Sequence, residues 1–164
     1  MKEFQSLEAF SNQLKSVIRK HHVREHKALD FIGKHIETEA KKTIGHLQDG
    51  AGEFETWPEL AESTKVDKEK KGYVFNEDYN PLYRTGELKK SIHHVVEIGG
   101  DNGRVYIGSD LDIALFQELG TKNIPARSFL GLTLFKEKHQ IQYLLGLFLY
   151  NWIIDTYATL RIKS

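Results

Sequence analysis

Histidine is the residue type with the most chemistry to offer in this sequence, which has eight of them and no cysteine. His22 and His26 are spaced i, i+4, which places both imidazoles on one face of a helix, with Glu25 beside them. Such ligands can hold a divalent metal ion that activates water for hydrolysis. The order of residues is not His-Glu-x-x-His, however, and the sequence marks no third ligand. We therefore predict a solvated, histidine-rich helix face and no metal site.

His93 and His94 are adjacent in a predicted strand. Neighbouring side chains of a strand point to opposite faces, so these two imidazoles cannot share one mononuclear site. His94 falls on the apolar face, where we expect it to be half-buried and hydrogen-bonded.

Two further groups of residues suggest catalysis only at first sight. Ser109, Asp110 and Asp112 lie near a predicted turn, where helix capping is their expected role. The glycines from Gly99 to Gly103 are followed neither by a helix nor by Gly-Lys-Ser/Thr, so they predict a hairpin turn and not a phosphate loop. We predict no catalytic residue, no cofactor and no enzymatic activity.

The composition excludes several other classes of protein. The 164 residues fit one domain, and 23 basic residues balance 23 acidic ones. A zero net charge disfavours a dedicated nucleic-acid surface. The four lysines closest together are interleaved with Asp67 and Glu69, which cancels most of their field: Lys65, Lys68, Lys70 and Lys71. The most apolar run, 141–154, is shorter than the ~20 residues that span a bilayer, so we expect no membrane segment.

The first third of the chain is predicted to be helical. Leu29, Ile32, Ile36, Ala40 and Ile44 recur at helical spacing. The polar stretch 19–26 is either a solvated part of one long helix or a break between two helices. Glycines in the segment 49–52 predict the end of this helical region.

A short helix is expected from Trp57, with Pro58 tolerated in its first turn. The segment 72–81 has no clear period and is predicted to be a loop. A second short helix is expected to be capped by Thr85.

The centre of the chain contains a predicted strand pair. Residues 92–98 alternate, with His94 and Val96 among those on the inner face, and residues 104–108 form the return strand. Asp110 or Asp112 is expected to cap a helix over 113–119, which Gly120 ends. The segment 124–127 is expected to be extended.

Thr133 is expected to cap a last helix, which continues to about Ile162. The fold class is therefore α+β, with a small antiparallel sheet and a central hairpin packed against long N- and C-terminal helices. We expect a single domain, 1–164, made of an N-terminal helical segment (1–50), a helix–hairpin–helix core (57–131) and a C-terminal helix (133–162).

The last helix is apolar on most of its faces, which indicates burial on most faces. In a domain of this size we expect another protein copy to cover part of it. The candidate interface residues lie on this helix and on the 72–81 loop with its flank, and we expect the loop to become ordered on assembly: Tyr73, Phe75, Tyr79, Arg84, Phe148 and Trp152.

An ordered set of residues in the last two-thirds of the chain resembles a known family. The set begins with Trp57, Pro58, Leu60 and Thr64 and continues through the stretches RTGEL (84–88), VYIGS (105–109) and IPARSFLG (124–131). It is similar to the phage virion-morphogenesis proteins, the Mu-type G protein and tail-completion group, within the broader phage head–tail joining (neck) proteins. The motif residues to which the resemblance gives structural roles are Trp57, Thr85, Gly86, Leu88, Gly108, Glu118, Gly120, Pro125, Arg127 and Phe129.

The resemblance implies a structural assembly protein, a tail-completion or head–tail connector subunit of a phage or prophage. Its partners would be further copies of itself in a ring and the tail-tube, terminator or head-connector proteins. It would be a virion component assembled in the bacterial host cytoplasm. Two alternatives stay open: a metal-dependent hydrolase using His22 and His26, and a DNA-binding neck or regulatory protein.

Glu118 and Arg127 flank the predicted turn at Gly120, and each has two possible roles. They can form a salt bridge or backbone hydrogen bonds that fix the 124–127 segment, or they can contact a neighbouring subunit. Arg84 presents the same choice, between holding its loop and projecting into a ring interface.

Overall fold

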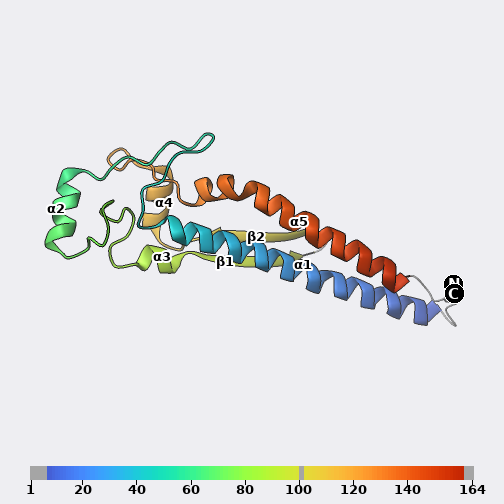
Figure 1. Ribbon diagram of the computed structural model, residues 1–164. Helices are drawn as coiled ribbons and strands as arrows, with labels where there is room; N and C mark the ends of the chain where they lie inside the picture. The colour runs from blue at the N-terminus through green and yellow to red at the C-terminus, as the bar shows by residue number, and fades with distance from the viewer. Residues whose placement is uncertain (1–6, 100–101, 161–164) are drawn as a thin grey trace.

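The computed structural model describes residues 7–99 and 102–160, which form an elongated molecule (Figure 1). The elements in chain order are α1 (Leu7–Thr43), α2 (Glu62–Lys70), α3 (Glu87–Ser91), β1 (His93–Gly99), β2 (Asn102–Gly108), α4 (Asp112–Leu119) and α5 (Leu130–Leu160). The two strands form an antiparallel sheet beside the long first and last helices, which confirms the predicted α+β arrangement.

The helix α1 holds the molecule together because it contacts the hairpin as well as α5. Its buried residues Ala28, Ile32, Ile36 and Ala40 recur every fourth position. Ile32, Ile36 and Ala40 belong to the predicted stripe, whereas Leu29, which was predicted with them, is half-buried. On the hairpin side, Gly33 allows close packing, since a Cβ atom there would lie 2.6 Å from the His94 ring. The helix α5 runs antiparallel to α1, so both ends of the described chain lie at one end of the molecule (Figure 1).

The polar stretch 19–26 lies inside one continuous helix, which settles the choice between one helix and two. The predicted end of this helix at 49–52 was wrong, because α1 ends at Thr43. Gly45 adopts a φ of 105°, which a helix cannot continue, and its N–H donates to the Pro81 carbonyl over 2.9 Å.

The hairpin follows the predicted alternation. Val96 pairs with Val105, and both lie on the less exposed face, whereas Val95 and Tyr106 pair on the exposed face. The return strand begins at Asn102, two residues earlier than predicted. Residues 100–101 of the predicted turn lie outside the described residues.

Two predicted helix starts in the first half were wrong. The helix α2 begins at Glu62 and not at Trp57, because the backbone at Trp57 is already engaged by the Gln48 carbonyl at 2.9 Å. The helix α3 begins at Glu87, and its N-cap is Gly86 with a φ of 83°, so the predicted cap Thr85 lies one residue before the actual cap. The Thr85 hydroxyl oxygen accepts a long 3.4 Å hydrogen bond from the Glu87 N–H.

Both later caps were also mispredicted, although Gly120 ends α4 as expected. Neither aspartate caps α4, whose N-cap is Leu111; the Ser109 hydroxyl instead accepts the Leu111 N–H at 3.1 Å. The helix α5 begins at Leu130, three residues before Thr133, whose hydroxyl donates to the Phe129 carbonyl. The predicted end of this helix at Ile162 lies outside the described residues.

His94 is half-buried and hydrogen-bonded between two carboxylates of α1, as predicted. Its Nδ1 lies 2.6 Å from Glu37 and its Nε2 lies 3.2 Å from Asp30. Burial acts to lower the pKa of His94, but the hydrogen bonds and charges of Glu37 and Asp30 outweigh it and raise the pKa above 6.5. For Glu37, burial acts to raise the pKa, but bonding to Lys41 and His94 lowers it below 4.5.

The His94–Glu37 pair predicts a pH-dependent stability. The His94 contribution is complete below its unfolded pKa, near 6.5, and is lost as pH rises through the raised folded value. The Glu37 contribution is complete above about 4.5 and is lost as pH falls through the lowered folded value. We therefore expect the difference in unfolding free energy between wild type and His94→Gln, measured with urea from pH 4 to 9, to be largest between about pH 4.5 and 6.5. His93→Gln is the matched control. A difference that grows from pH 6.5 to 9 would contradict this interaction.

Candidate functional site

The motif residues of the second half meet where α4 leads into α5. One carboxylate oxygen of Glu118 accepts the N–H groups of Phe129 and Leu130 at 2.8 and 2.9 Å. The other accepts the Gly131 N–H at 2.8 Å and the Ser128 hydroxyl at 2.5 Å. A negative charge at a helix N-terminus is favourable, and these N–H groups have no partner within the helix. Glu118 is therefore the N-terminal cap of α5, although it belongs to α4.

Arg127 fastens the same junction to the segment before α2. It is only 5% exposed, and its guanidinium donates to the carbonyls of Pro58 at 2.9 Å and Glu59 at 3.1 Å. Burial lowers the pKa of Arg127. Glu118 and Arg127 thus each bind backbone groups of their own chain, as the first of the two sequence-based accounts proposed.

The remaining motif residues surround a small core. Phe129 is fully buried, and the Trp57 indole N–H donates to the Ser128 carbonyl at 3.2 Å. Gly120 has a φ of 74°, and a Cβ atom there would lie 2.8 Å from the Ala126 nitrogen, so only glycine fits. Gly86 and Leu88 are buried and Gly108 is half-buried, whereas Thr85 and Pro125 are exposed.

Lys68 is a structural residue that the sequence analysis missed. Its side chain is buried, and the ammonium donates to the carbonyls of Tyr79, Asn80 and Tyr83 at 2.6, 2.6 and 2.8 Å. Burial, with the nearby charge of Arg84, lowers the pKa of Lys68 to about 8. Within a run of alternating charges, nothing in the sequence separates this lysine from its exposed neighbours.

The 72–81 loop is irregular, as predicted, and these bonds hold it within a single chain. Tyr79 and Asn80 have positive φ values, which turn their carbonyls toward Lys68. The ordering of this loop on assembly stays a prediction. Among the candidate interface residues here, Phe75 is 66% exposed and Tyr73 is half-buried.

Arg84 and Tyr79 both have partners in their own chain. Arg84 bonds to Asp67 at 2.9 Å, and the Tyr79 hydroxyl donates to Glu69 at 2.9 Å. Arg84 thus holds its loop, the first of its two proposed roles. Beside this loop lies a groove of about 740 Å³, between α2, α3 and the turn after α4.

The helix α5 has one face toward α1 and large exposed apolar residues on its other faces. Phe148 contacts Phe31 with ring centres 6.1 Å apart, and Trp152 contacts His21 at 5.0 Å, so both candidate residues lie on the side facing α1. The large apolar residues on the other faces are between 40% and 65% exposed: Tyr143, Leu145, Leu147, Leu149, Tyr150, Ile153 and Ile154.

A second exposed apolar patch covers α4. Ala114 is buried, while four large side chains around it are between 42% and 71% exposed: Ile113, Leu115, Phe116 and Leu119. Contiguous exposed apolar surface of this kind marks interaction sites in soluble proteins. The α4 patch and the outward face of α5 lie on different elements.

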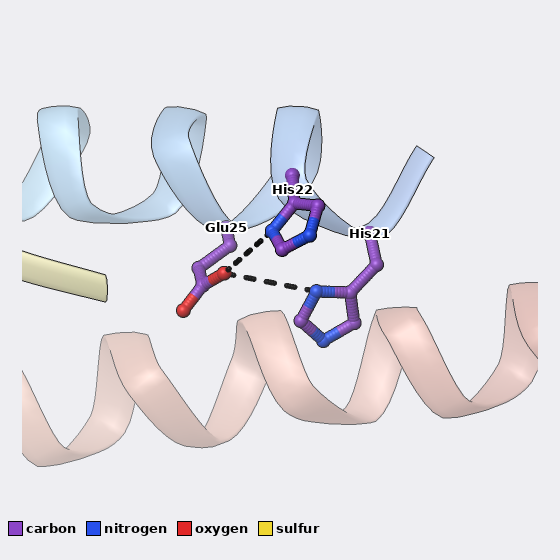
Figure 2. A group of neighbouring side chains, drawn as sticks. All are labelled: His21, His22 and Glu25. Carbon is purple, nitrogen blue, oxygen red and sulfur yellow. Dashed lines mark ion pairs between the residues drawn. The ribbon is translucent and has the colours of Figure 1, made fainter. Parts of the chain in front are cut away.

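The histidine-rich part of α1 is arranged differently from the sequence prediction. The structure brings Glu25 together with His21 and His22, and His26 is not part of this group. The carboxylate Oε2 atom lies 3.7 Å from each of the two histidine Nδ1 atoms. The Glu25 and His21 side chains point from α1 toward α5, whereas the His22 ring lies over the α1 ribbon (Figure 2). Among the described residues, the group that could hold a metal ion therefore contains His21 and not His26.

Three of the four lysines near α2 are paired with carboxylates or buried. Lys65 pairs with Glu59 at 3.0 Å, Lys71 pairs with Asp67 at 2.8 Å, and Lys68 is buried. Among the helices that the structure describes, none is sufficiently long and apolar to cross a membrane.

Comparisons with protein-family models, curated proteins and solved structures each return no match. The functional assignment therefore depends on the geometry above and on the motif resemblance.

Removing the cap of α5 should destabilise the whole fold. Glu118→Ala leaves three N–H groups of the first turn without their acceptor and should lower the free energy of unfolding by about 2–3 kcal/mol. Chemical denaturation monitored by circular dichroism measures this loss. The exposed Glu53→Ala change is the control, and equal effects of the two variants would contradict the cap.

Lys68→Met should cost about 3 kcal/mol of stability, because three carbonyls lose a charged donor that is buried with them. Lys70→Met, on the exposed side of the same helix, should change stability by less than about 0.5 kcal/mol. Limited proteolysis provides a second measurement, since only the Lys68 variant should be cut faster within 72–81. A loop that is cut equally fast in both variants would show that Lys68 does not anchor it.

Proposed function

We propose that this protein is a structural assembly subunit of a phage or prophage, acting in tail completion or as a head–tail connector. It works by protein–protein contacts, as a virion component assembled in the bacterial host cytoplasm. Its partners are further copies of itself and the tail-tube, terminator or head-connector proteins.

The observation that carries this proposal is the exposed apolar surface of α5. Leu149 and Ile153 are 56% and 57% exposed one helical turn apart, and their neighbours Tyr150 and Ile154 are 63% and 49% exposed. Leaving this much apolar surface in water is costly, at roughly 25 cal/mol per Å². Burial against another protein surface recovers that free energy, so the helix fits a subunit designed for assembly.

A ring needs a heterologous contact, in which different surfaces of neighbouring copies meet. In the proposal, the outward face of α5 packs on the next copy, and the α4 patch, including Phe116 and Leu119, binds the tail or head protein. The balance of 23 basic and 23 acidic residues leaves little charge repulsion between copies. The resemblance to virion-morphogenesis proteins supplies the phage context for this arrangement.

The proposal predicts that charges on the outward face of α5 abolish assembly without unfolding the protein. In a phage or prophage lacking its own copy, wild-type protein supplied in trans should restore joined particles. The Leu149→Lys/Ile153→Lys double variant should reduce infectious titre by orders of magnitude, because two lysines must be desolvated in the contact.

The matched control is Gln142→Lys/Asn151→Lys, which adds the same charge at exposed polar positions of α5. Both variants should keep the melting temperature of the wild type within a few degrees. If the apolar double variant restores titre as well as the control does, the α5 face is not the assembly contact.

A further inference from the structure

We propose that His21, His22 and Glu25 form a binding site for one divalent transition-metal ion of the zinc class. This site is separate from the assembly surfaces, and the proposal does not depend on the assembly role. It also differs from the hydrolase hypothesis, because His26 is not a ligand and no catalytic role is assigned.

The donor atoms are already close to a metal-binding arrangement. One ligand atom from each residue lies within 4.8 Å of the other two, and the Glu25 Oε2 atom lies 3.7 Å from both histidine Nδ1 atoms. Metal–ligand bonds of about 2.0–2.2 Å in a tetrahedral site place donors roughly 3.3 Å apart. Each Glu25–histidine pair must therefore shorten by about 0.4 Å, and rotation of the two histidine side chains must bring their donor atoms, now within 4.8 Å, to the same spacing.

The protein's own hydrogen bonds do not account for this arrangement. Both 3.7 Å separations are within ion-pair range but too long for hydrogen bonds, so the carboxylate lies between two imidazoles and hydrogen-bonds to neither. The His22 Nδ1 atom is shielded from solvent and has no hydrogen-bond partner. An unpaired buried nitrogen is unfavourable, and a metal ion would satisfy it.

The surrounding elements hold two of the ligands in place. The Trp152 ring of α5 packs edge-on against the His21 ring with their centres 5.0 Å apart. The other Glu25 oxygen lies against Gly103 of β2, where an added Cβ atom would be only 2.6 Å from it. Figure 2 shows Glu25 and His21 between the ribbons of α1 and α5. Packing of this kind orients ligands and limits the entropy lost on binding.

The ligand set selects the class of metal. Two imidazoles and one carboxylate suit zinc and its neighbours, whereas magnesium and calcium prefer oxygen ligands alone. Three protein ligands leave a fourth position for water. A bound ion would join residues that touch α5 and β2, and so would stabilise the end of the molecule where the long helices terminate.

The test uses the full chain, purified without a tag and treated with a chelator. Isothermal titration with Zn²⁺ should show one ion per chain and a raised melting temperature, since a ligand that binds only the folded state stabilises it. Cobalt in place of zinc should give the intense visible absorption bands of a tetrahedral site.

Single changes His21→Ala, His22→Ala and Glu25→Gln should each weaken zinc binding by roughly tenfold or more. His26→Ala is the matched control, because it removes an exposed histidine of the same helix, and it should leave the affinity unchanged. Gly103→Ala should also weaken binding, because the added Cβ would lie 2.6 Å from the Glu25 Oε1 atom and 2.5 Å from Leu29, and both side chains would have to move. Melting curves without metal confirm that the variants fold. Absence of saturable binding, a ratio of one ion per two chains, or an equal loss in His26→Ala would overturn the proposal.

Discussion

The hydrogen bonds between the Glu118 carboxylate and the first turn of α5 are the interaction on which the rest of the structure depends. They fix where the longest apolar helix begins, at Leu130, and the direction in which it leaves the core. A local cap such as Thr133 would belong to the helix that it starts. Glu118 belongs to α4, so the position of α5 is coupled to the packing of α4 and to the turn at Gly120.

Arg127 and Lys68 extend the same principle to the irregular part of the chain. Each is a buried cation whose donors are directed at backbone carbonyls, two for Arg127 and three for Lys68. Irregular backbone lacks the regular hydrogen bonds of helices and sheets, so its carbonyl groups need other donors. A side chain with several donors can supply these hydrogen bonds. The hydrophobic core around Phe129 is small. The hydrogen bonds of Arg127 and Lys68 therefore hold much of the irregular chain between α1 and α5 in place.

The sequence predicted the elements well and their ends poorly. Alternation in the hairpin and the four-residue period from Ile32 to Ala40 both follow from burial of one face, so both appear in the structure as expected. The ends of helices depend on partners distant in sequence. Trp57 is held by Gln48 and Ser128, and no local pattern reveals such contacts. His21 was missed for the same reason, since its position relative to Glu25 and Trp152 depends on two helices.

The motif residues and the exposed apolar faces have different roles in this account. The residues that carry the resemblance to virion-morphogenesis proteins mostly build the junction, whereas in the proposed function Leu149 and Ile153 on α5 provide the surface for assembly. The most direct measurement is electron microscopy of particles produced, without this protein, by the phage or prophage in which we propose that it acts. The account predicts full heads and finished tails that remain separate. Normal joined, infectious particles would contradict it.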